Sequence, residues 1–258
     1  MDKSIVYCLL LCFGIGTSTV LSQNDTKLSL GEQPIFKVSQ TNQKIIIDGK
    51  MNEEIWAHTE ARIFDNFYRI DKPDDQQKTT FRMLWDEKNL YLFYQMEDKF
   101  LTARETERDG EPYLDDCAEI FFITVPDSLD THIGFELNLY KASNDFVYFN
   151  DFYQSQHGIL KTFNPVFEVE VTYDGTINNN SDIDKGWTME LAIPISNFDG
   201  LANFVPVQAG NKWAFLAIRQ DRNDSLGNRR STSTIFPIYD ISKNVHQANR
   251  FGLMEFVE

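Results

Sequence analysis

The clearest structural signal in the chain is the stretch at residues 79–96, which reads TTFRMLWDEKNLYLFYQM. Its first half alternates, so that Phe81, Met83 and Trp85 fall on one face of an extended strand. Its second half, Leu90 to Met96, is apolar on both faces, which is typical of a strand buried in the centre of a sheet. A short polar turn joins the two halves, and we therefore predict a β-hairpin.

The same two-residue period recurs along most of the chain. Shorter runs of this kind occur at residues 44–47, 117–124, 135–139, 167–171, 187–191, 213–217 and 252–256. Turn residues separate these runs, and Asn52 to Trp56 fits a single helical turn. No internal repeat or domain-scale linker interrupts the series. The pattern predicts one all-β domain, an antiparallel β-sandwich.

Composition and charge narrow the possible partners. Of the 258 residues, 42% are hydrophobic and 14% aromatic, which is enough for a sizeable core and argues against disorder. The formal net charge of -15 argues against nucleic acid and anionic membranes, because both bind basic surfaces. The charge is compatible with neutral sugars and with calcium.

Residues 1–22 have the pattern of a secretory signal peptide. Lys3 precedes a short apolar run from Ile5 to Phe13, and Ser22 is a small residue at the expected cleavage site. The run is too short to span a bilayer as a helix, although an uncleaved anchor is the alternative. We predict a secreted or periplasmic protein with no membrane span in its mature part. Residues 23–34 would be a flexible leader, and residues 35–258 the folded domain.

Cleavage would leave Cys117 as the one cysteine of the mature chain, so an internal disulfide is not expected. Cys117 lies in an apolar strand, where cysteine more often serves as a small buried side chain than as a nucleophile. Stability must then come from the core, with or without a bound metal ion.

Motifs for common catalytic chemistries are missing. The chain has no G-x-S-x-G elbow, no phosphate-binding loop of the Walker type and no H-E-x-x-H pair. Its four histidines are far apart and lack the spacing of zinc ligands. Acidic residues are abundant, so a glycosidase pair remains an alternative by number alone. We predict a protein that is not an enzyme.

The strongest acidic cluster is formed by Asp115, Asp116 and Glu119, with Asp98 nearby in the sequence. The two-residue period places Glu119 on the opposite face from Ala118 and Ile120, alongside Cys117 and Phe121. A carboxylate within a buried strand is costly unless it is paired or hydrogen-bonded. It could accept bonds from sugar hydroxyls, bind calcium, or pair with an arginine or backbone amides. Asp98 and Asp115 are the candidate calcium ligands.

Aromatic rings can bind a sugar by stacking on its apolar face. The four tryptophans lie in or beside apolar strands, so we expect them to pack in the core. Tyr113 differs, because it follows the polar loop 109–112 and precedes the acidic cluster. It is the candidate stacking platform, and a loop tyrosine packed on the edge of the sandwich is the alternative.

Five segments in order resemble the family 9 carbohydrate-binding modules and their family 9-like relatives. They are IDGKMNEEIW at 47–56, MLWDEKNLYL at 83–92, YLDDCAEIF at 113–121, DKGWTMELAIP at 184–194 and RFGL at 250–253. The resemblance covers residues 44–256. It implies a jelly-roll-type β-sandwich related to the DOMON domains, which binds the ends of sugar chains in a slot between two aromatic rings. It also implies that structural calcium is possible.

Carried over by position, the resemblance places the first ring at Tyr113, where characterised modules have tryptophan. The family's carboxylate that bonds sugar hydroxyls corresponds to Glu119, and the acidic residue near it corresponds to Asp116. A polar position of the adjoining strand corresponds to Asn138. His246 is a candidate edge contact.

Three features depart from the family pattern. The second ring is expected near Val245 or His246, and neither residue is a tryptophan, tyrosine or phenylalanine. A position that carries arginine in the best-known module carries Glu136. The chain is also longer between Leu139 and Trp187, where Tyr148, Phe149, Phe152 and Tyr153 could replace the ring or pack.

The sequence therefore predicts an exported, non-catalytic protein that binds oligo- or polysaccharide. Other exported glycan-processing proteins are the candidate protein partners. One alternative is a DOMON-like domain that binds haem or another cofactor, for which the candidate ligands are Met83, Met96, His157 and His246. Another is a structural module of an exported glycan-processing complex.

Overall fold

The computed structural model describes residues 35–68, 76–153, 156–200, 204–222, 224, 229–238 and 244–258. The side chains of residues 151–153 and 229–230 are not described, so the expectations for Phe152 and Tyr153 lie outside the described part. The expected signal peptide and leader, residues 1–34, also lie outside it. No helix in the described ranges is long and apolar enough to cross a membrane.

Strands dominate the described chain, as the two-residue period predicted. They are β1 (Phe36–Gln40), β2 (Arg62–Ile63), β3 (Asn66–Phe67), β4 (Thr79–Trp85), β5 (Asn89–Glu97), β6 (Cys117–Ile123), β7 (Thr131–Asn138), β8 (Ser143–Tyr153), β9 (Gln156–Leu160), β10 (Glu168–Asp174), β11 (Gly186–Pro194), β12 (Lys212–Arg222), β13 (Arg229–Thr234) and β14 (Gly252–Val257). Helical turns are short: α1 (Glu54–His58), η1 (Pro112–Leu114), η2 (Ile195–Phe198) and η3 (Ala248–Arg250).

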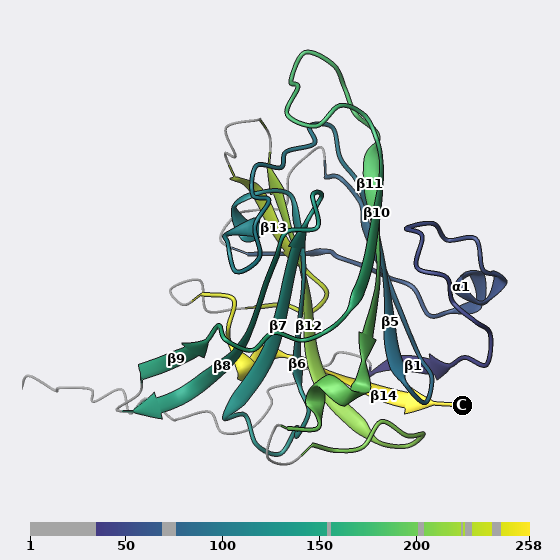
Figure 1. Cartoon of the computed structure of the whole chain (residues 1–258), viewed down its shortest axis with the longest axis vertical. Helices are drawn as coiled ribbons and strands as arrows, with labels where there is room; N and C mark the ends of the chain where they lie inside the picture. Colours follow the sequence, from purple (N-terminus) through teal and green to yellow (C-terminus); the bar gives the residue numbers. More distant parts are fainter. Residues whose placement is uncertain are drawn as a thin grey trace, which may run out of the picture.

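The strands form two layers that share a common edge (Figure 1). One layer has the order β10-β11-β5-β4, and the other has the order β12-β6-β7-β8-β9. Strands β1 and β14 lie between β4 and β12 in this order and connect the layers. Strand β1 runs parallel to β4 and β14, whereas the other neighbours along the order are antiparallel. The expectation of an all-β sandwich is confirmed.

The predicted hairpin is formed by β4 and β5. Trp85 pairs with Leu90 at its closed end. The carboxylate of Asp86 accepts bonds from the backbone N–H groups of Lys88 and Asn89, both at 2.7 Å. This Asx-type cap explains why the polar turn closes tightly.

The core lies between the two layers and is rich in aromatic rings. Phe215 of β12 pairs with Phe122 of β6, and its ring centroid lies 6.1 Å from that of Phe81 and 5.5 Å from that of Phe36. All four tryptophans are at most 4% exposed, as predicted: Trp56, Trp85, Trp187 and Trp213. Burial of each large apolar side chain stabilises the fold by about 1.5–3 kcal/mol. Cys117 is also fully buried.

Two of the sequence motifs meet at one buried carboxylate. Glu190 Oε2 accepts bonds from the backbone N–H groups of Asp48 and Gly49, each at 3.0 Å, and Oε1 accepts from the indole of Trp56 at 3.2 Å. Gly49 has a φ of 74°, a left-handed conformation that glycine adopts without strain. The opening segment 47–56 is thereby attached to β11. Burial raises the pKa of Glu190 from 4.5 to about 7.

This shift makes a prediction for stability. The folded state holds the Glu190 proton more tightly than the unfolded chain, so the free energy of unfolding should fall as pH rises from about 4.5 to about 7. Over this range wild type should lose about 3 kcal/mol more than Glu190→Gln, which keeps the contributions of other buried carboxyls such as Asp98. Chemical denaturation at pH 5 and pH 8 measures it, with the exposed Glu168→Gln as control. A wild type and a Glu190→Gln variant with the same pH dependence would contradict this.

Candidate functional site

A cleft of about 290 Å³ opens on the outer face of the β12-β6-β7-β8-β9 layer. The alternation of β6 explains which residues reach it. Ile120 and Phe122 point toward the core between the layers, so Glu119 and Phe121 point to the opposite face. Glu119 lines the cleft itself.

Strand register sets a row of polar side chains across this face. Glu119 of β6 is paired with Glu136 of β7, and Glu136 is paired with Asn144 of β8. The three side chains are at most 5% exposed, and all of them line the cleft. Gln220 extends the row onto β12.

Hydrogen bonds hold the row in place. Gln220 Nε2 donates to Glu119 Oε1 at 2.8 Å, and Asn144 Nδ2 donates to Glu136 Oε2 at 2.6 Å. Thr232 Oγ1 donates to the amide oxygen of Gln220 at 2.7 Å, which fixes the orientation of that amide. Asn144 Oδ1 is buried and has no hydrogen-bond partner in the described part of the chain. A buried acceptor of this kind is a place for a ligand donor.

The row carries two carboxylates in a poorly solvated place. Burial raises the pKa of Glu136 well above its ordinary value, and the charge of Glu119 raises it further. The bond from Asn144 and the charge of Lys161 lower it in part. Glu136 therefore favours its protonated form or a nearby positive group.

Tyr113 stands at the rim of this row. It lies in η1, and its ring is partly buried. The side chain of Arg222 fixes the position of η1, because it donates hydrogen bonds to the backbone carbonyls of Tyr113 and Leu114. The phenol donates to Glu111 Oε1 at 2.7 Å, and partial burial together with this carboxylate raises the pKa of Tyr113 to about 12. A neutral, partly exposed phenol can serve as a platform.

Apolar side chains complete the walls and floor. They come from Phe146 of β8, Ile159 of β9 and Val245, and Tyr68 contributes a buried ring. Gly134 explains how Phe146 reaches the floor, because a Cβ at position 134 would lie 2.2 Å from Cζ of that ring. The longer segment after Leu139 thus supplies part of the cleft.

His246 reaches the cleft at the end of a chain of hydrogen bonds. Asn150 donates through Nδ2 to the carbonyl of Leu129, so its Oδ1 must accept from His132 Nδ1 at 3.0 Å. His132 Nε2 lies 2.9 Å from His246 Nδ1 and must then accept from it. The ring of His246 also stacks on Tyr148 and Phe121. Nε2 is left as the nitrogen of His246 that a ligand can reach.

Three of the five residues proposed for carbohydrate binding come together at the cleft: Tyr113, Glu119 and His246. Asp116 and Asn138 lie elsewhere. Both oxygens of Asp116 accept backbone N–H bonds, from Thr102 and Arg222 at 2.6 Å, and its side chain is fully buried. Asn138 Nδ2 donates to Asp115 Oδ2 at 2.9 Å. These side chains brace the backbone near η1 and do not line the cleft.

Sequence reasoning did not select Asn144 or Gln220, and it noted Glu136 only as a departure from the family pattern. Glu136 occupies a polar position in the alternating strand β7, whereas Asn144 and Gln220 lie in continuous polar runs, where the local pattern does not show which face a side chain takes. Their convergence depends on the register between β12, β6, β7 and β8, which one sequence does not reveal.

The proposed calcium ligands are separated by the fold. Asp98 joins Asp116 and Asp221 in a buried group whose ligand oxygens lie within 4.8 Å of one another. Arg219 Nη2 lies 2.9 Å from Asp98 Oδ2 and 3.8 Å from Asp221 Oδ1. Burial raises the pKa of Asp98 to about 6.

Asp115 belongs to a different set of contacts. It pairs with Arg104 at 3.0 Å and accepts backbone bonds from Arg104 and Glu105. The group of Asp98, Asp116 and Asp221 offers carboxylate oxygens, which are the ligands that calcium prefers. The guanidinium of Arg219 contacts two of its three carboxylates, those of Asp98 and Asp221.

The candidate cofactor ligands do not meet in one place. Met83 and Met96 are at most 2% exposed and pack in the core between the layers. His157 is exposed and stacks on Tyr148, which also stacks on His132 and His246. Met96 lines a hollow that contains no histidine, and His246 lines the cleft, which contains no methionine.

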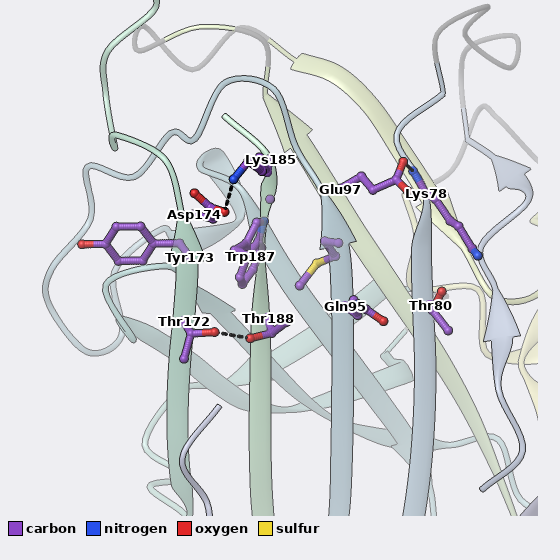
Figure 2. Close-up of a pocket in the computed structure, with 12 residues that line it drawn as sticks. Lys78, Thr80, Gln95, Glu97, Thr172, Tyr173, Asp174, Lys185, Trp187 and Thr188 are labelled. Carbon is purple, nitrogen blue, oxygen red and sulfur yellow. Dashed lines mark hydrogen bonds and ion pairs between the residues drawn. The ribbon is translucent and has the colours of Figure 1, made fainter. Parts of the chain in front are cut away.

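A second hollow, of about 350 Å³, lies on the outer face of the opposite layer (Figure 2). Its floor is a cross-strand row of Thr172, Thr188, Gln95 and Thr80. The threonine hydroxyls already contact each other at 2.6 Å, and Lys185 pairs with Asp174 at 2.7 Å on the rim. Tyr173 projects away from the row (Figure 2). We therefore take the cleft of Tyr113 and Glu119 as the candidate site.

Comparison with known proteins identifies the family of the chain. The chain belongs to the carbohydrate family 9 binding domain-like family, whose model matches residues 47–258. None of the curated proteins matches the chain in sequence.

Solved structures show the same fold at low sequence identity. A family 9 carbohydrate-binding module from Caldicellulosiruptor kristjanssonii in complex with cellotriose has 20% identity and a TM-score of 0.56 over 87% of this chain and 94% of that chain. The same kind of module in complex with glucose has 18% identity and a TM-score of 0.55, over 85% and 95% of the two chains. A protein from Bacteroides uniformis that is assigned to carbohydrate binding has 16% identity and a TM-score of 0.62, over 86% and 98%.

The histidine chain makes a spectroscopic prediction. Burial lowers the pKa of His132 well below its ordinary value and that of His246 to about 3, so both rings should be neutral at pH 5. Their proton should sit on Nδ1 in both cases. Nitrogen-15 NMR of labelled histidine reports charge and tautomer directly. Asn150→Leu should disturb the tautomer of His132, and a protonated His246 at pH 5 would overturn the scheme.

Proposed function

We propose that the protein is an exported, non-catalytic module that binds oligo- or polysaccharide in the cleft of Tyr113, Glu119 and His246. The observation that carries this proposal is the partly exposed ring of Tyr113 at the rim of a buried row of hydrogen-bonding side chains. Sugars need both features, an aromatic face for their C–H groups and fixed polar atoms for their hydroxyls. Family membership supports the same conclusion.

The placement of the acidic residues supports binding without catalysis. Glu119 and Glu136 are directly opposite in adjacent strands, so their Cβ atoms are about 5 Å apart and both side chains rise from the same floor. A glycosidase places its two carboxyl groups on either side of the bond that is cleaved. Both glutamates of the cleft would instead contact one face of a bound sugar.

Export is proposed from the N-terminal residues. The pattern at 1–22 fits a signal peptide, which would deliver the protein to the periplasm or the medium. Polysaccharides and the proteins that process them are available in those places, and such proteins are the proposed protein partners.

A structural calcium ion is part of the proposal. Asp98, Asp116 and Asp221 would hold it, because they provide closely spaced buried oxygens. When bound, the ion would neutralise this group and connect β12 to the loops that follow β5 and precede β6. It would act on stability and would not touch the sugar.

Removal of the platform ring tests the function. Tyr113→Ala should weaken the binding of a cello-oligosaccharide or other bound glycan about tenfold, which is about 1.4 kcal/mol. Tyr173→Ala is the matched control, because that ring is exposed on the other layer. Isothermal titration calorimetry against a glycan panel measures both. A folded wild-type protein that binds no glycan would refute the proposed function.

Chelation tests the calcium ion. Added calcium should raise the melting temperature of chelator-treated protein by several degrees at pH 7.5, since a ligand that binds only the folded state stabilises it. Asp116→Asn should remove most of that response, whereas the exposed Glu168→Gln should not. An unchanged melting temperature in calcium and in chelator would show that Arg219 and protons suffice.

A further inference from the structure

We propose that a free sugar hydroxyl donates a hydrogen bond to His246 Nε2, so that the cleft takes glycans with that hydroxyl unsubstituted and rejects those that are O-methylated or O-acetylated there. His132 and Asn150 are the positioning residues, because they fix which nitrogen of His246 carries the proton. This inference rests on the proposed function, since it names the class of glycan that the same site takes.

The hydrogen-bonding role of His246 is set by a relay of side chains. The backbone carbonyl of Leu129 accepts from Asn150 Nδ2, which leaves Asn150 Oδ1 as the acceptor for His132 Nδ1 at 3.0 Å. A neutral His132 that donates from Nδ1 accepts at Nε2, and this nitrogen lies 2.9 Å from His246 Nδ1. His246 therefore carries its proton on Nδ1 and a lone pair on Nε2.

Packing keeps the relay in this state. His132 is 1% exposed, and both imidazole rings stack on Tyr148, with centroid distances of 4.6 Å for His132 and 4.3 Å for His246. Phe121 also stacks on His246, at 4.9 Å. Burial lowers the pKa of His246 to about 3, so the ring is neutral near pH 7 and its Nε2 can only accept.

The Nε2 atom of His246 is available to a ligand. Among the described residues it accepts no hydrogen bond, and it is not shielded from solvent, since His246 lines the cleft. Tyr148 and Phe121 stack on the imidazole, so a ligand in the cleft meets the ring at its edge. A lone pair at this edge pairs with a donor and not with an ether or ester oxygen.

Asn144 presents a second acceptor to the same cleft. Its Nδ2 donates to Glu136 Oε2 at 2.6 Å, and that oxygen can accept the bond whether or not Glu136 carries a proton on its other oxygen. Oδ1 of Asn144 has no partner in the described part of the chain. The phenol of Tyr113 adds no free donor, because it donates to Glu111 at 2.7 Å. A ligand that brings donors therefore fits these atoms better than one that brings acceptors.

Substitution of a hydroxyl removes the donor that His246 needs. A free hydroxyl donates and accepts, whereas the oxygens of a methyl ether or an acetyl ester only accept. A substituted sugar would leave Nε2 without a partner and would add a group to a cleft of about 290 Å³. Sites built around a ligand hydroxyl can reject an analogue that lacks it by about 10⁴-fold, because buried polar groups are then unpaired. Since Nε2 is open to the cleft, we expect the smaller factor of about ten.

Fluorine separates loss of the donor from added bulk, because fluorine is close to a hydroxyl in size and cannot donate. The probes are cellotriose, or a trisaccharide of the glycan panel that binds more tightly, and its analogues with one hydroxyl replaced by fluorine. At one hydroxyl, fluorine should weaken binding to the wild-type chain about tenfold, and O-methylation there should cost at least as much. Isothermal titration calorimetry at pH 7.5 measures each affinity.

Variants assign that hydroxyl to His246. In His246→Leu the parent sugar and its fluorine analogue should bind within about twofold of each other, because the acceptor is gone. Gln95→Leu, on the outer face of the opposite layer, is the matched control and should keep the wild-type ratio. Asn150→Leu removes the acceptor of His132 Nδ1 and lets the relay reverse, so that His246 can donate from Nε2. The ratio should then fall, although Asn150 does not line the cleft.

Nitrogen-15 NMR of labelled histidine tests the same contact without a substitution, and it decides the matter if His246→Leu does not fold. Saturation with cellotriose, or with the tighter trisaccharide, should move the resonance of His246 Nε2 toward that of a hydrogen-bonded nitrogen. The exposed His58 of α1 is the internal control, and its resonances should not change.

Two contrary outcomes are distinct. A sugar that binds with no fluorine effect coupled to His246, or with an unchanged Nε2 resonance, would overturn this inference and leave carbohydrate binding standing. A folded chain that binds no glycan of the panel would overturn both proposals.

Discussion

Strand β6 separates two environments, and the rest of the structure depends on this separation. One of its faces packs Ile120 and Phe122 into the aromatic core, and the other presents Glu119 and Phe121 outward. Because successive side chains of a strand point to opposite faces, a shift of one residue would exchange them. It would place Glu119 in the core and expose the apolar side chains. The burial energy of the core therefore fixes the position of the carboxylate in the cleft.

The interactions around this strand divide between support and recognition. Asp116 and Asn138, near the ends of β6 and β7, hold the backbone through bonds to Thr102, Arg222 and Asp115. The side chain of Arg222 in turn donates a hydrogen bond to the carbonyl of Leu114 and so positions η1, which contains Tyr113. Further along the same strands, polar side chains have fewer internal partners and face the cleft. Acidic residues that are neighbours in the sequence thus have separate roles, because the strand end meets a loop and the strand centre meets a cavity.

Much of the fold could be read from the sequence. The alternation in 79–96 predicted the hairpin of β4 and β5, and the apolar context of the tryptophans predicted their burial. The site was only partly accessible to the same reasoning. Tyr113 and Glu119 were selected because a loop aromatic and a strand carboxylate stand out locally. Asn144 and Gln220 did not stand out, since a polar residue in a strand is ordinary until its cross-strand neighbours are known.

The sequence by itself determined the secondary structure, the all-β class and the family, because side-chain period and local motifs are properties of short segments. The tertiary structure alone decided which polar residues share the cleft and what they can do there. His132 and His246 are 114 positions apart in the sequence, and only packing brings Nε2 of His132 to 2.9 Å from Nδ1 of His246. This hydrogen bond decides which nitrogen of His246 faces a ligand. The opposed positions of Glu119 and Glu136 arise in the same way, since strand register is fixed by the core and not by either residue.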